Sequence, residues 1–422
     1  MTRTFTLTRL AAVGVLACAA PVAADTIAVT GATIYQRSDH KLEGATLVIR
    51  DGKIAEVGAG VAVPAGATRI DGTGKTVTAG LIEASTQLGL IEVDLEESGN
   101  DGRFAVLPTE IHAAYRAVDA YSGRSVAIPI ARAGGVTSAI TGPSGGLVAG
   151  QAAWVSLGEG AGPLAPIAPL RAPVAMNMSL GRDAMAIGSR GHTVERLREL
   201  FDDVDNYRRN RAGFERNASR RLIAQRLDLE ALLPVLDGRE LVAIRASAEV
   251  DIRAALAIAA ERRLRIAIVG GTEAWRVAAE LAAARVPVLL DPTDNLPGDL
   301  GAVNVRDDNA TVLARAGVVV GISTLGSTSA ARTIRQLAGI AVAQGLPWQK
   351  GLAAITEVPA QIYGGAAERG TLERGKIADV VVWSGDPLEL SSRAETVIIG
   401  GAVQSLATHQ SRLLDRYKVL HR

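Results

Sequence analysis

The chain of 422 residues is poor in several residue types that mark particular classes of protein. It has one cysteine and five histidines, which excludes an internal disulfide and gives few ligands for a histidine-rich metal site. Aromatic residues make up 3%, and the formal net charge of +1 creates no field that would attract nucleic acid. Hydrophobic residues make up 48%, which is enough for a packed core. A globular protein without a nucleic-acid partner is therefore expected.

The first residues have the pattern of a secretory signal peptide. Arg3 and Arg9 precede an apolar run over residues 10–20, and small residues follow at positions 22–24. Cleavage after Ala24 is expected, which would give a periplasmic or secreted mature protein. The run is too short for a membrane span, and no later run reaches the roughly 20 apolar residues that a bilayer requires. No transmembrane span is predicted.

The single cysteine, Cys18, lies inside this apolar run. Cleavage after Ala24 would remove it, so the mature protein would have neither a disulfide nor a cysteine nucleophile. A lipoprotein anchored through Cys18 is the less favoured alternative, because Val15-Leu16-Ala17 matches a lipobox poorly.

Short strands are predicted near both ends of the mature chain. The strand-like segments are residues 27–29, 46–49, 54–57, 378–383 and 395–399. Two β-rich pieces at opposite ends suggest one small sheet domain made from both termini.

The middle of the chain alternates apolar strands with helical patterns. Residues 241–246 are followed by a helical pattern at 251–263, and residues 265–269 lead into another at 273–284. Such βα units predict a parallel sheet, either a closed barrel or an open doubly wound sheet. The glycine-rich stretch 139–146 lacks the Lys-Ser or Lys-Thr of a phosphate-binding loop, so we interpret it as a structural turn.

Two segments of the chain resemble the amidohydrolase superfamily. Residues 72–89, with the sequence GTGKTVTAGLIEASTQLG, resemble its first barrel strand, and residues 370–383, GTLERGKIADVVVW, resemble its return to a small β domain. Between them, residues 228–232, the helix start at 251–252 and residues 270–275 are similar to the imidazolonepropionase-like branch. The resemblance implies an α/β fold, a TIM-like (β/α)8 barrel with a small composite β-sandwich domain built from both ends of the chain.

This resemblance also implies domain boundaries. They are a signal peptide at residues 1–24, the first part of the β-sandwich at 25–78, the barrel at 79–365, the second part of the sandwich at 366–408, and a C-terminal tail at 409–422.

Members of this superfamily bind zinc or another divalent metal at the barrel mouth, but the matching positions here lack the usual ligands. Those positions are Ser85 and Gln87 for the His-x-His pair, Asn177 for the carbamylated lysine, Arg245 and Gly270 for two further histidines, and Leu325 for the aspartate. Asparagine cannot form a carbamate, and the fixed charge of Arg245 would repel a cation. No metal cofactor is therefore expected.

Other polar residues are expected at the same end of the barrel. Ser247 follows one predicted strand, and Asp291 follows another at residues 286–290. An Arg245–Asp291 pair is expected to be a structural ion pair rather than a catalytic couple. An arginine beside amide and hydroxyl groups is better suited to holding a carboxylate than to cleaving an amide.

We therefore expect an exported amidohydrolase-like pseudoenzyme, which acts as a binding or partner subunit without metal-dependent hydrolysis. One alternative is an active hydrolase of carbon–nitrogen bonds, in a cyclic or peptide-like amide, with a rearranged site. The other is a structural scaffold with a filled pocket. The expected partners are a small-molecule or peptide-like ligand and a second subunit, either another copy of the chain or an active homologue.

Overall fold

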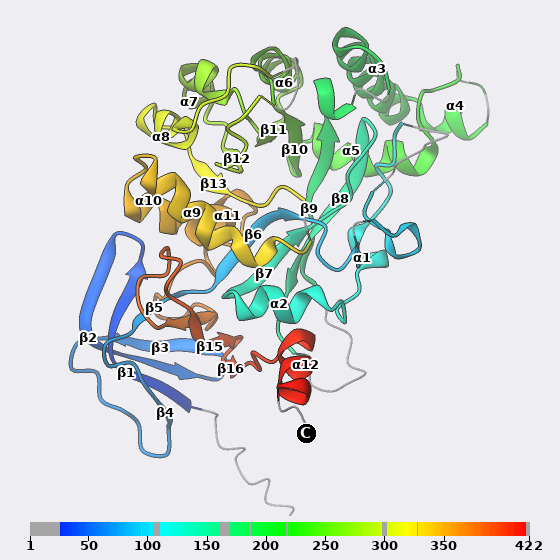
Figure 1. Ribbon diagram of the computed structural model, residues 1–422. Helices are drawn as coiled ribbons and strands as arrows, with labels where there is room; N and C mark the ends of the chain where they lie inside the picture. Colours follow the sequence, from blue (N-terminus) through cyan, green and yellow to red (C-terminus); the bar gives the residue numbers. More distant parts are fainter. Residues whose placement is uncertain are drawn as a thin grey trace, which may run out of the picture.

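The computed structural model describes residues 26–418, except residues 94, 104–109, 160–168, 185–186, 217, 219, 298–301 and 327. The expected signal peptide and Cys18 lie outside the described residues. Two eight-stranded sheets organise the chain, a small separate sheet and a larger one that forms a barrel (Figure 1). Among the described helices, none is long and apolar enough to cross a membrane.

The small sheet contains strands from both ends of the chain. Its order is β16-β15-β14-β5-β1-β2-β3, with β4 beside β1. The strands are β1 (Thr26–Arg37), β2 (His40–Arg50), β3 (Lys53–Gly58), β4 (Thr68–Asp71), β5 (Thr76–Ala79), β14 (Val380–Trp383), β15 (Ala394–Ile399) and β16 (Ala402–Val403). Strand β5 joins the two halves, because it pairs with β1 on one side and β14 on the other. The predicted composite domain is confirmed.

The larger sheet is a nearly closed barrel. Its strands, in order around the sheet, are β6 (Leu81–Thr86), β7 (Val136–Thr141), β8 (Val148–Ser156), β9 (Pro169–Ser179), β10 (Leu241–Ala246), β11 (Arg265–Gly270), β12 (Val288–Leu290) and β13 (Val320–Ile322). A bridge between Thr86 and Gly326 brings the last strand back to the first. The barrel was one of the two arrangements that the βα pattern allowed, and it is confirmed.

One strand departs from the expected (β/α)8 repeat. Strand β8 runs antiparallel to both β7 and β9. Only residues 142–147 join β7 to β8, whereas a parallel connection needs about a dozen residues or more. Gly145 and Gly146 turn the chain there with φ of 97° and 72°. The glycine-rich stretch is therefore a structural turn, as interpreted.

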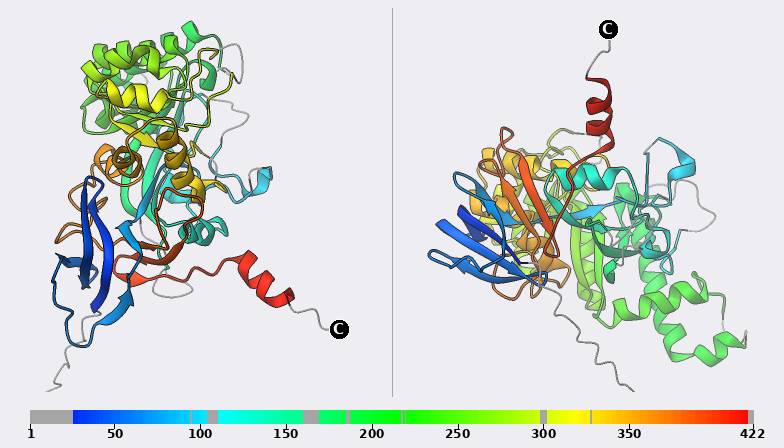
Figure 2. Two further views of the ribbon diagram at one scale, coloured as in Figure 1. Left: turned by 60° about the vertical axis from the view of Figure 1, so that its left-hand side comes forward. Right: turned by 90° about the horizontal axis from the view of Figure 1, so that it is seen from below.

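Helices pack around the barrel. The α-helices are α1 (Ala117–Ala120), α2 (Ala127–Ala133), α3 (Arg190–Arg209), α4 (Arg211–Glu215), α5 (Arg226–Leu236), α6 (Glu249–Arg262), α7 (Ala278–Ala284), α8 (Asn309–Arg315), α9 (Ile334–Ala343), α10 (Trp348–Ala354), α11 (Glu357–Ile362) and α12 (His409–Tyr417). The short 3-10 helices are η1 (Glu97–Gly99), η2 (Gly181–Ala184), η3 (Ala274–Val277) and η4 (Ala331–Thr333). Helix α12 projects from the body of the molecule (Figure 2).

Alternate residues of the barrel strands face two different cores. Ile244 and Ile268 pack in the core that contains the helices, while Ala243 and Val269 join an inner cluster from strands all around the barrel. Tyr363, directly after α11, belongs to the inner cluster too. The same cluster contains residues from the beginnings of the barrel strands, so α11 packs against the N-terminal end of the barrel.

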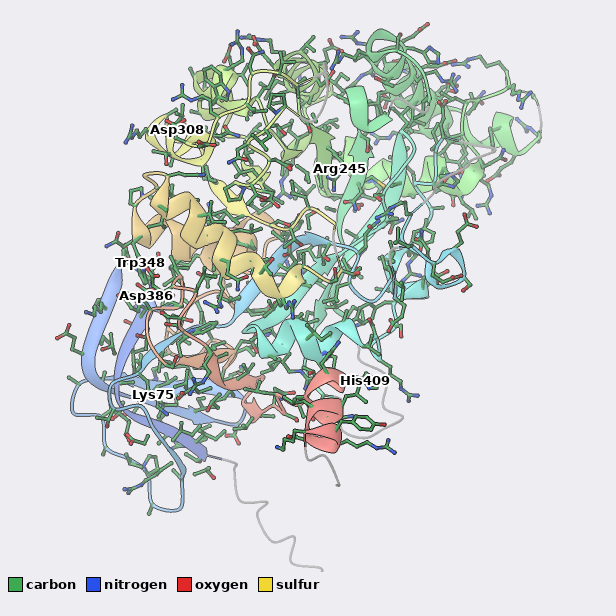
Figure 3. All side chains as sticks on the ribbon, in the orientation of Figure 1. Lys75, Arg245, Asp308, Trp348, Asp386 and His409 are labelled. Carbon is green, nitrogen blue, oxygen red and sulfur yellow. The ribbon has the colours of Figure 1, made fainter. Side chains whose placement is uncertain are left out.

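An aromatic and polar contact joins the barrel to the small sheet. The rings of Tyr35 in β1 and Trp348 in α10 lie 4.6 Å apart. Trp348 Nε1 also donates to Asp386 Oδ2 at 2.9 Å, in the connection between β14 and β15 (Figure 3). These contacts hold the sheet domain against the helical layer.

Candidate functional site

The C-terminal ends of the barrel strands bring two of the sequence-predicted residues together. Gln87 directly follows β6, and Arg245 lies near the end of β10 (Figure 3). A Cβ atom placed on Gly326 would lie 3.7 Å from Gln87 Oε1 and 3.9 Å from Arg245 Nη2. Both side chains therefore lie close to Gly326, at the seam where the barrel closes.

The Gln87 side chain connects two loops through hydrogen bonds. It is 3% exposed, and its Nε2 donates to the carbonyl of Gly102 at 2.6 Å and to Ser144 Oγ at 2.7 Å. Its Oε1 accepts from Arg103 Nη2 at 3.3 Å. The amide thus ties the loop after β6 to the turn after β7, and both its donor and its acceptor functions are in use.

Asn177 has a similar structural contact in β9. Its Nδ2 donates to the carbonyl of Pro143 at 2.9 Å. A Cβ placed on Gly142 would lie 2.6 Å from that nitrogen, so only glycine allows this close approach. Asn177 therefore holds the β7–β8 turn against the barrel.

Arg245 is half-buried and is held by the main chain. Its Nη2 donates to the carbonyl of Leu325 at 3.1 Å. Leu325 has a φ of 52°, a conformation that a branched side chain rarely adopts. Within the part of the chain that the structure describes, this is the one hydrogen bond of the Arg245 side chain, so other N–H groups of the guanidinium remain for a ligand.

Asp291 forms a local turn instead of an ion pair. Its Oδ1 accepts from the Thr293 N–H at 2.8 Å and from Thr293 Oγ1 at 2.6 Å. The described residues contain no Arg245–Asp291 ion pair, so that prediction is wrong. An aspartate two residues before a threonine bonds readily to its own backbone, and this local contact takes the carboxylate away from Arg245.

Ser85 and Gly270 contribute mainly through their backbones. The N–H of Ser85 donates to Glu83 Oε1 at 3.2 Å, and its carbonyl accepts from Ser323 Oγ at 3.0 Å. Gly270 has a φ of 98°, and a Cβ placed on it would lie 3.1 Å from Ser247 Oγ. No described contact joins Gly270 to Gln87 or Arg245.

The sequence analysis missed Glu83, a fully buried carboxylate in β6. It accepts hydrogen bonds from Ser323 Oγ, from Thr324 Oγ1 at 3.1 Å and from the Thr324 N–H at 3.3 Å. Burial raises the pKa of Glu83 to about 7, against the opposing effect of these hydrogen bonds. Glu83 therefore links the first barrel strand to the segment after the last one, and closes the seam.

A signal for Glu83 was present in the sequence. It lies in the segment GLIEAS, where a carboxylate stands between the apolar residues Ile82 and Ala84. Its partners could not be inferred, because Ser323 is 240 residues away in the chain.

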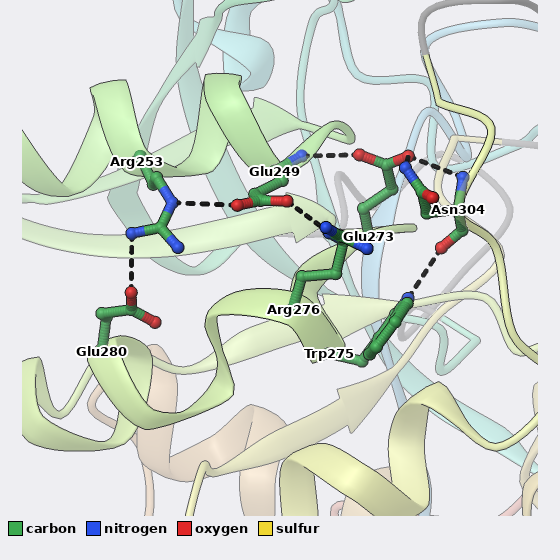
Figure 4. A network of polar contacts seen from close by, with 7 residues as sticks. All are labelled: Glu249, Arg253, Glu273, Trp275, Arg276, Glu280 and Asn304. Atoms are coloured by element: carbon green, nitrogen blue, oxygen red, sulfur yellow. Dashed lines mark hydrogen bonds and ion pairs between the residues drawn. The ribbon is translucent and has the colours of Figure 1, made fainter.

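A polar network fixes the loops that surround this end of β10, β11 and β12 (Figure 4). Glu273 is 4% exposed, and its oxygens accept from the N–H of Glu249 at 2.9 Å and from the N–H of Asn304 at 2.8 Å. Trp275 Nε1 donates to the Asn304 carbonyl at 2.7 Å, and Arg276 pairs with Glu249. Glu273 therefore holds the start of α6 and the loop after β12 in place.

In the described ranges of the chain, no group of three or more His, Cys, Asp or Glu residues is placed to hold a metal ion. Two carboxylates of the barrel strands and the segments after them, Glu83 and Asp291, each accept hydrogen bonds within the protein.

The fold defines an α/β protein with a TIM-like barrel and a composite sheet domain. A family model described as the amidohydrolase family matches residues 307–404. An amidohydrolase from Thermotoga maritima MSB8 has 26% sequence identity and a TM-score of 0.79, over 89% of this chain and 99% of that one. The chain is thus similar to amidohydrolases in sequence near its end and in fold over most of its length.

More distant solved structures share the fold alone. Molinate hydrolase has 16% identity and a TM-score of 0.57, over 91% of this chain and 95% of that one. A zinc-bound adenosine deaminase from Xanthomonas campestris has 16% identity and a TM-score of 0.52, over 93% and 97% of the two chains. Several chemistries therefore occur on this architecture.

Proposed function

We propose that the chain is an amidohydrolase-fold protein that binds a carboxylate-bearing ligand at the barrel mouth and has no metal-dependent hydrolysis. The observation that carries the proposal is the placement of Arg245. Its guanidinium is half-buried, is held in place by the Leu325 carbonyl, and lies with Gln87 beside Gly326. A fixed guanidinium with donors to spare matches the two oxygens of a carboxylate.

The chemistry of the residues at the barrel mouth supports the absence of a metal role. A catalytic zinc is held by neutral imidazoles and carboxylates, whereas the matching positions have Ser85, Gln87 and Asn177. Gln87 and Asn177 are already bonded inside the protein, and Arg245 adds a positive charge. This set does not fit a zinc ion, so no step is assigned to one.

The ligand class in this proposal is a small or peptide-like molecule with a free carboxylate. The structure leaves no acid–base pair facing such a ligand among the residues discussed above. Glu83 is 0% exposed, and its described hydrogen bonds all lie in the barrel wall. We favour binding over hydrolysis for this reason. An active hydrolase and a bare scaffold are then outcomes of the test.

The experiment combines metal analysis with ligand binding. The purified mature protein should contain far less than one zinc, manganese or cobalt per chain, and added metal should produce no hydrolysis of dipeptides or N-acetyl amino acids. Calorimetry with N-acetyl-L-alanine should show binding that Arg245→Gln weakens by about tenfold or more, while Arg69→Gln on the exposed strand β4 leaves it unchanged. One or two tightly held metals, together with chelator-sensitive turnover, would overturn the proposal. No binding of N-acetyl-L-alanine by the natural protein would support the scaffold.

Export and assembly belong to the same proposal. The amino-terminal pattern supports a mature chain that starts at or near Asp25 in the periplasm or outside the cell. Amino-terminal sequencing of the protein from its producing cell tests this. A role as partner subunit predicts that the protein purifies with another copy of itself or with an active homologue, which light scattering and mass spectrometry of the purified complex would reveal.

A further inference from the structure

The opposite, N-terminal end of the barrel contains a cavity of about 260 Å³. It forms where β10 and β11 begin, beside the first residues of β9 and the end of α11. Its charged and aromatic lining residues are Arg171, Arg239, Glu240, Arg265 and Tyr363. None of these residues belongs to the site at the barrel mouth.

Glu240 is the unusual member of this lining. It directly precedes β10, is 8% exposed, and its Oε1 is buried with no hydrogen-bond partner among the described residues. Buried carboxylates are normally paired or hydrogen-bonded, because leaving one unmatched costs free energy. Burial alone raises the pKa of Glu240 to about 7. The nearby arginines thus leave the carboxylate uncompensated.

The arginines of the cavity have their own contacts. Arg171 Nη1 donates to the Gly364 carbonyl at 2.7 Å, and Arg239 Nη2 donates to Asp237 Oδ2 at 2.7 Å. Arg265 Nη1 reaches only the Arg239 carbonyl, at 3.5 Å, and forms no ion pair with any residue that the structure describes. An unmatched carboxylate and a guanidinium without an acidic partner therefore line one cavity without meeting.

We propose that this cavity binds a small zwitterion, whose protonated amine pairs with Glu240 and whose carboxylate pairs with Arg265. The volume is below the roughly 300–1,000 Å³ of pockets for drug-sized molecules, so the ligand has the size of an amino acid. A cation alone would meet three arginines at the cavity wall. An anion alone would leave Glu240 unmatched. A molecule with both charges satisfies both sides.

The affinity of this cavity for its ligand should depend on pH. The amine of the ligand pairs with the ionised form of Glu240, so binding releases a proton wherever the free carboxyl is protonated. Affinity should therefore rise as the pH increases through about 7 and level off above it. Calorimetry at pH 6 in buffers of different ionisation enthalpy measures the released proton.

The probes are linear amino acids with the amine at the chain end, from β-alanine to 6-aminohexanoate, together with the alkylamine and the carboxylate of each length. One length should bind the full-length protein at least about tenfold more tightly than its matched amine or carboxylate. Glu240→Gln and Arg265→Gln should each weaken that binding about tenfold or more. Glu56→Gln and Arg69→Gln, exposed in the small sheet, are matched controls that should not change it.

Several outcomes would overturn the proposal. They are no binding by any length, equal binding of an amine or a carboxylate alone, and unchanged binding in Glu240→Gln. If Glu240→Gln does not fold, Arg265→Gln and the proton release of the natural protein decide the question. Because this cavity and Arg245 lie at opposite ends of the barrel, Arg245→Gln should leave the binding of these probes intact, and failure of the site at the barrel mouth would leave this result unaffected.

Discussion

Buried polar side chains at the two ends of the barrel differ in their hydrogen-bond partners. At the C-terminal end, Glu83 accepts hydrogen bonds from both sides of the seam, and Gln87 fastens two loops. At the N-terminal end, Glu240 is 8% exposed and has an oxygen with no hydrogen-bond partner among the described residues. Burial raises the pKa of both glutamates to about 7. The same raised pKa thus accompanies a satisfied structural residue in one place and an unmatched charge in the other.

The sharpest test of this comparison replaces each glutamate with leucine. Glu83→Leu should lower the free energy of unfolding by about 3–5 kcal/mol, because it removes the hydrogen bonds that Ser323 and Thr324 donate to Glu83 across the seam. Glu240→Leu should be neutral or stabilise by about 1–2 kcal/mol, because it removes an unpaired buried carboxylate. Urea unfolding at pH 8 measures both values. Equal losses in the two variants would mean that Glu240 has a structural partner after all.

The pH dependence of stability is the next largest effect. Each glutamate has a folded-state pKa of about 7, above the ordinary value of 4.5. Between these two values the folded chain keeps protons that the unfolded chain has released, so stability falls as the pH rises from 4.5 to 7 and is level above that. The fall is at most about 3 kcal/mol per group.

Thermal unfolding from pH 4.5 to 8 measures this slope. Glu83→Gln and Glu240→Gln should each reduce it, and the double variant should come close to removing the contribution of these two sites. A slope that the double variant leaves unchanged would contradict the assignment. A slope that only Glu240→Gln reduces would show that hydrogen bonds keep Glu83 ionised.

Patterns local in the chain predicted much of this fold. The strands at both ends and the βα units in the middle follow from alternation and helical periodicity, which depend on neighbouring residues alone. The reversed direction of β8 was not predicted, since it depends on how residues 142–147 turn the chain. A short glycine-rich turn was visible in the sequence, but its effect on the barrel was not.

The candidate site was less accessible to sequence reasoning. Resemblance placed Gln87 and Arg245 at the same end of the barrel, and in the structure both side chains lie close to Gly326. The predicted ion pair of Arg245 with Asp291 was wrong, because Asp291 accepts hydrogen bonds within its own turn. The unmatched oxygen of Glu240 had no sequence signal, since the lack of a partner depends on every side chain nearby.

A smaller effect is expected from the loops at the barrel mouth. Gln87→Ala should lower the free energy of unfolding by about 1–3 kcal/mol, because it removes the amide that joins Gly102 to Ser144. Hydrogen exchange in the loop after β6 should accelerate in this variant. Asn177→Ala is a useful comparison, since it frees only the turn at Pro143. Unchanged exchange after β6 in Gln87→Ala would show that other contacts hold that loop.

The smallest effect is expected at Asp291, and it separates local structure from ligand binding at the same end of the barrel. Asp291→Ala should lower the free energy of unfolding by only about 0.5–1.5 kcal/mol, because it removes hydrogen bonds within one exposed turn. The affinity for N-acetyl-L-alanine should stay unchanged, because Arg245 is held by the Leu325 carbonyl and not by this carboxylate. Calorimetry of the variant measures it. A change in affinity as large as that of Arg245→Gln would mean that the two side chains are coupled in the ligand-bound protein.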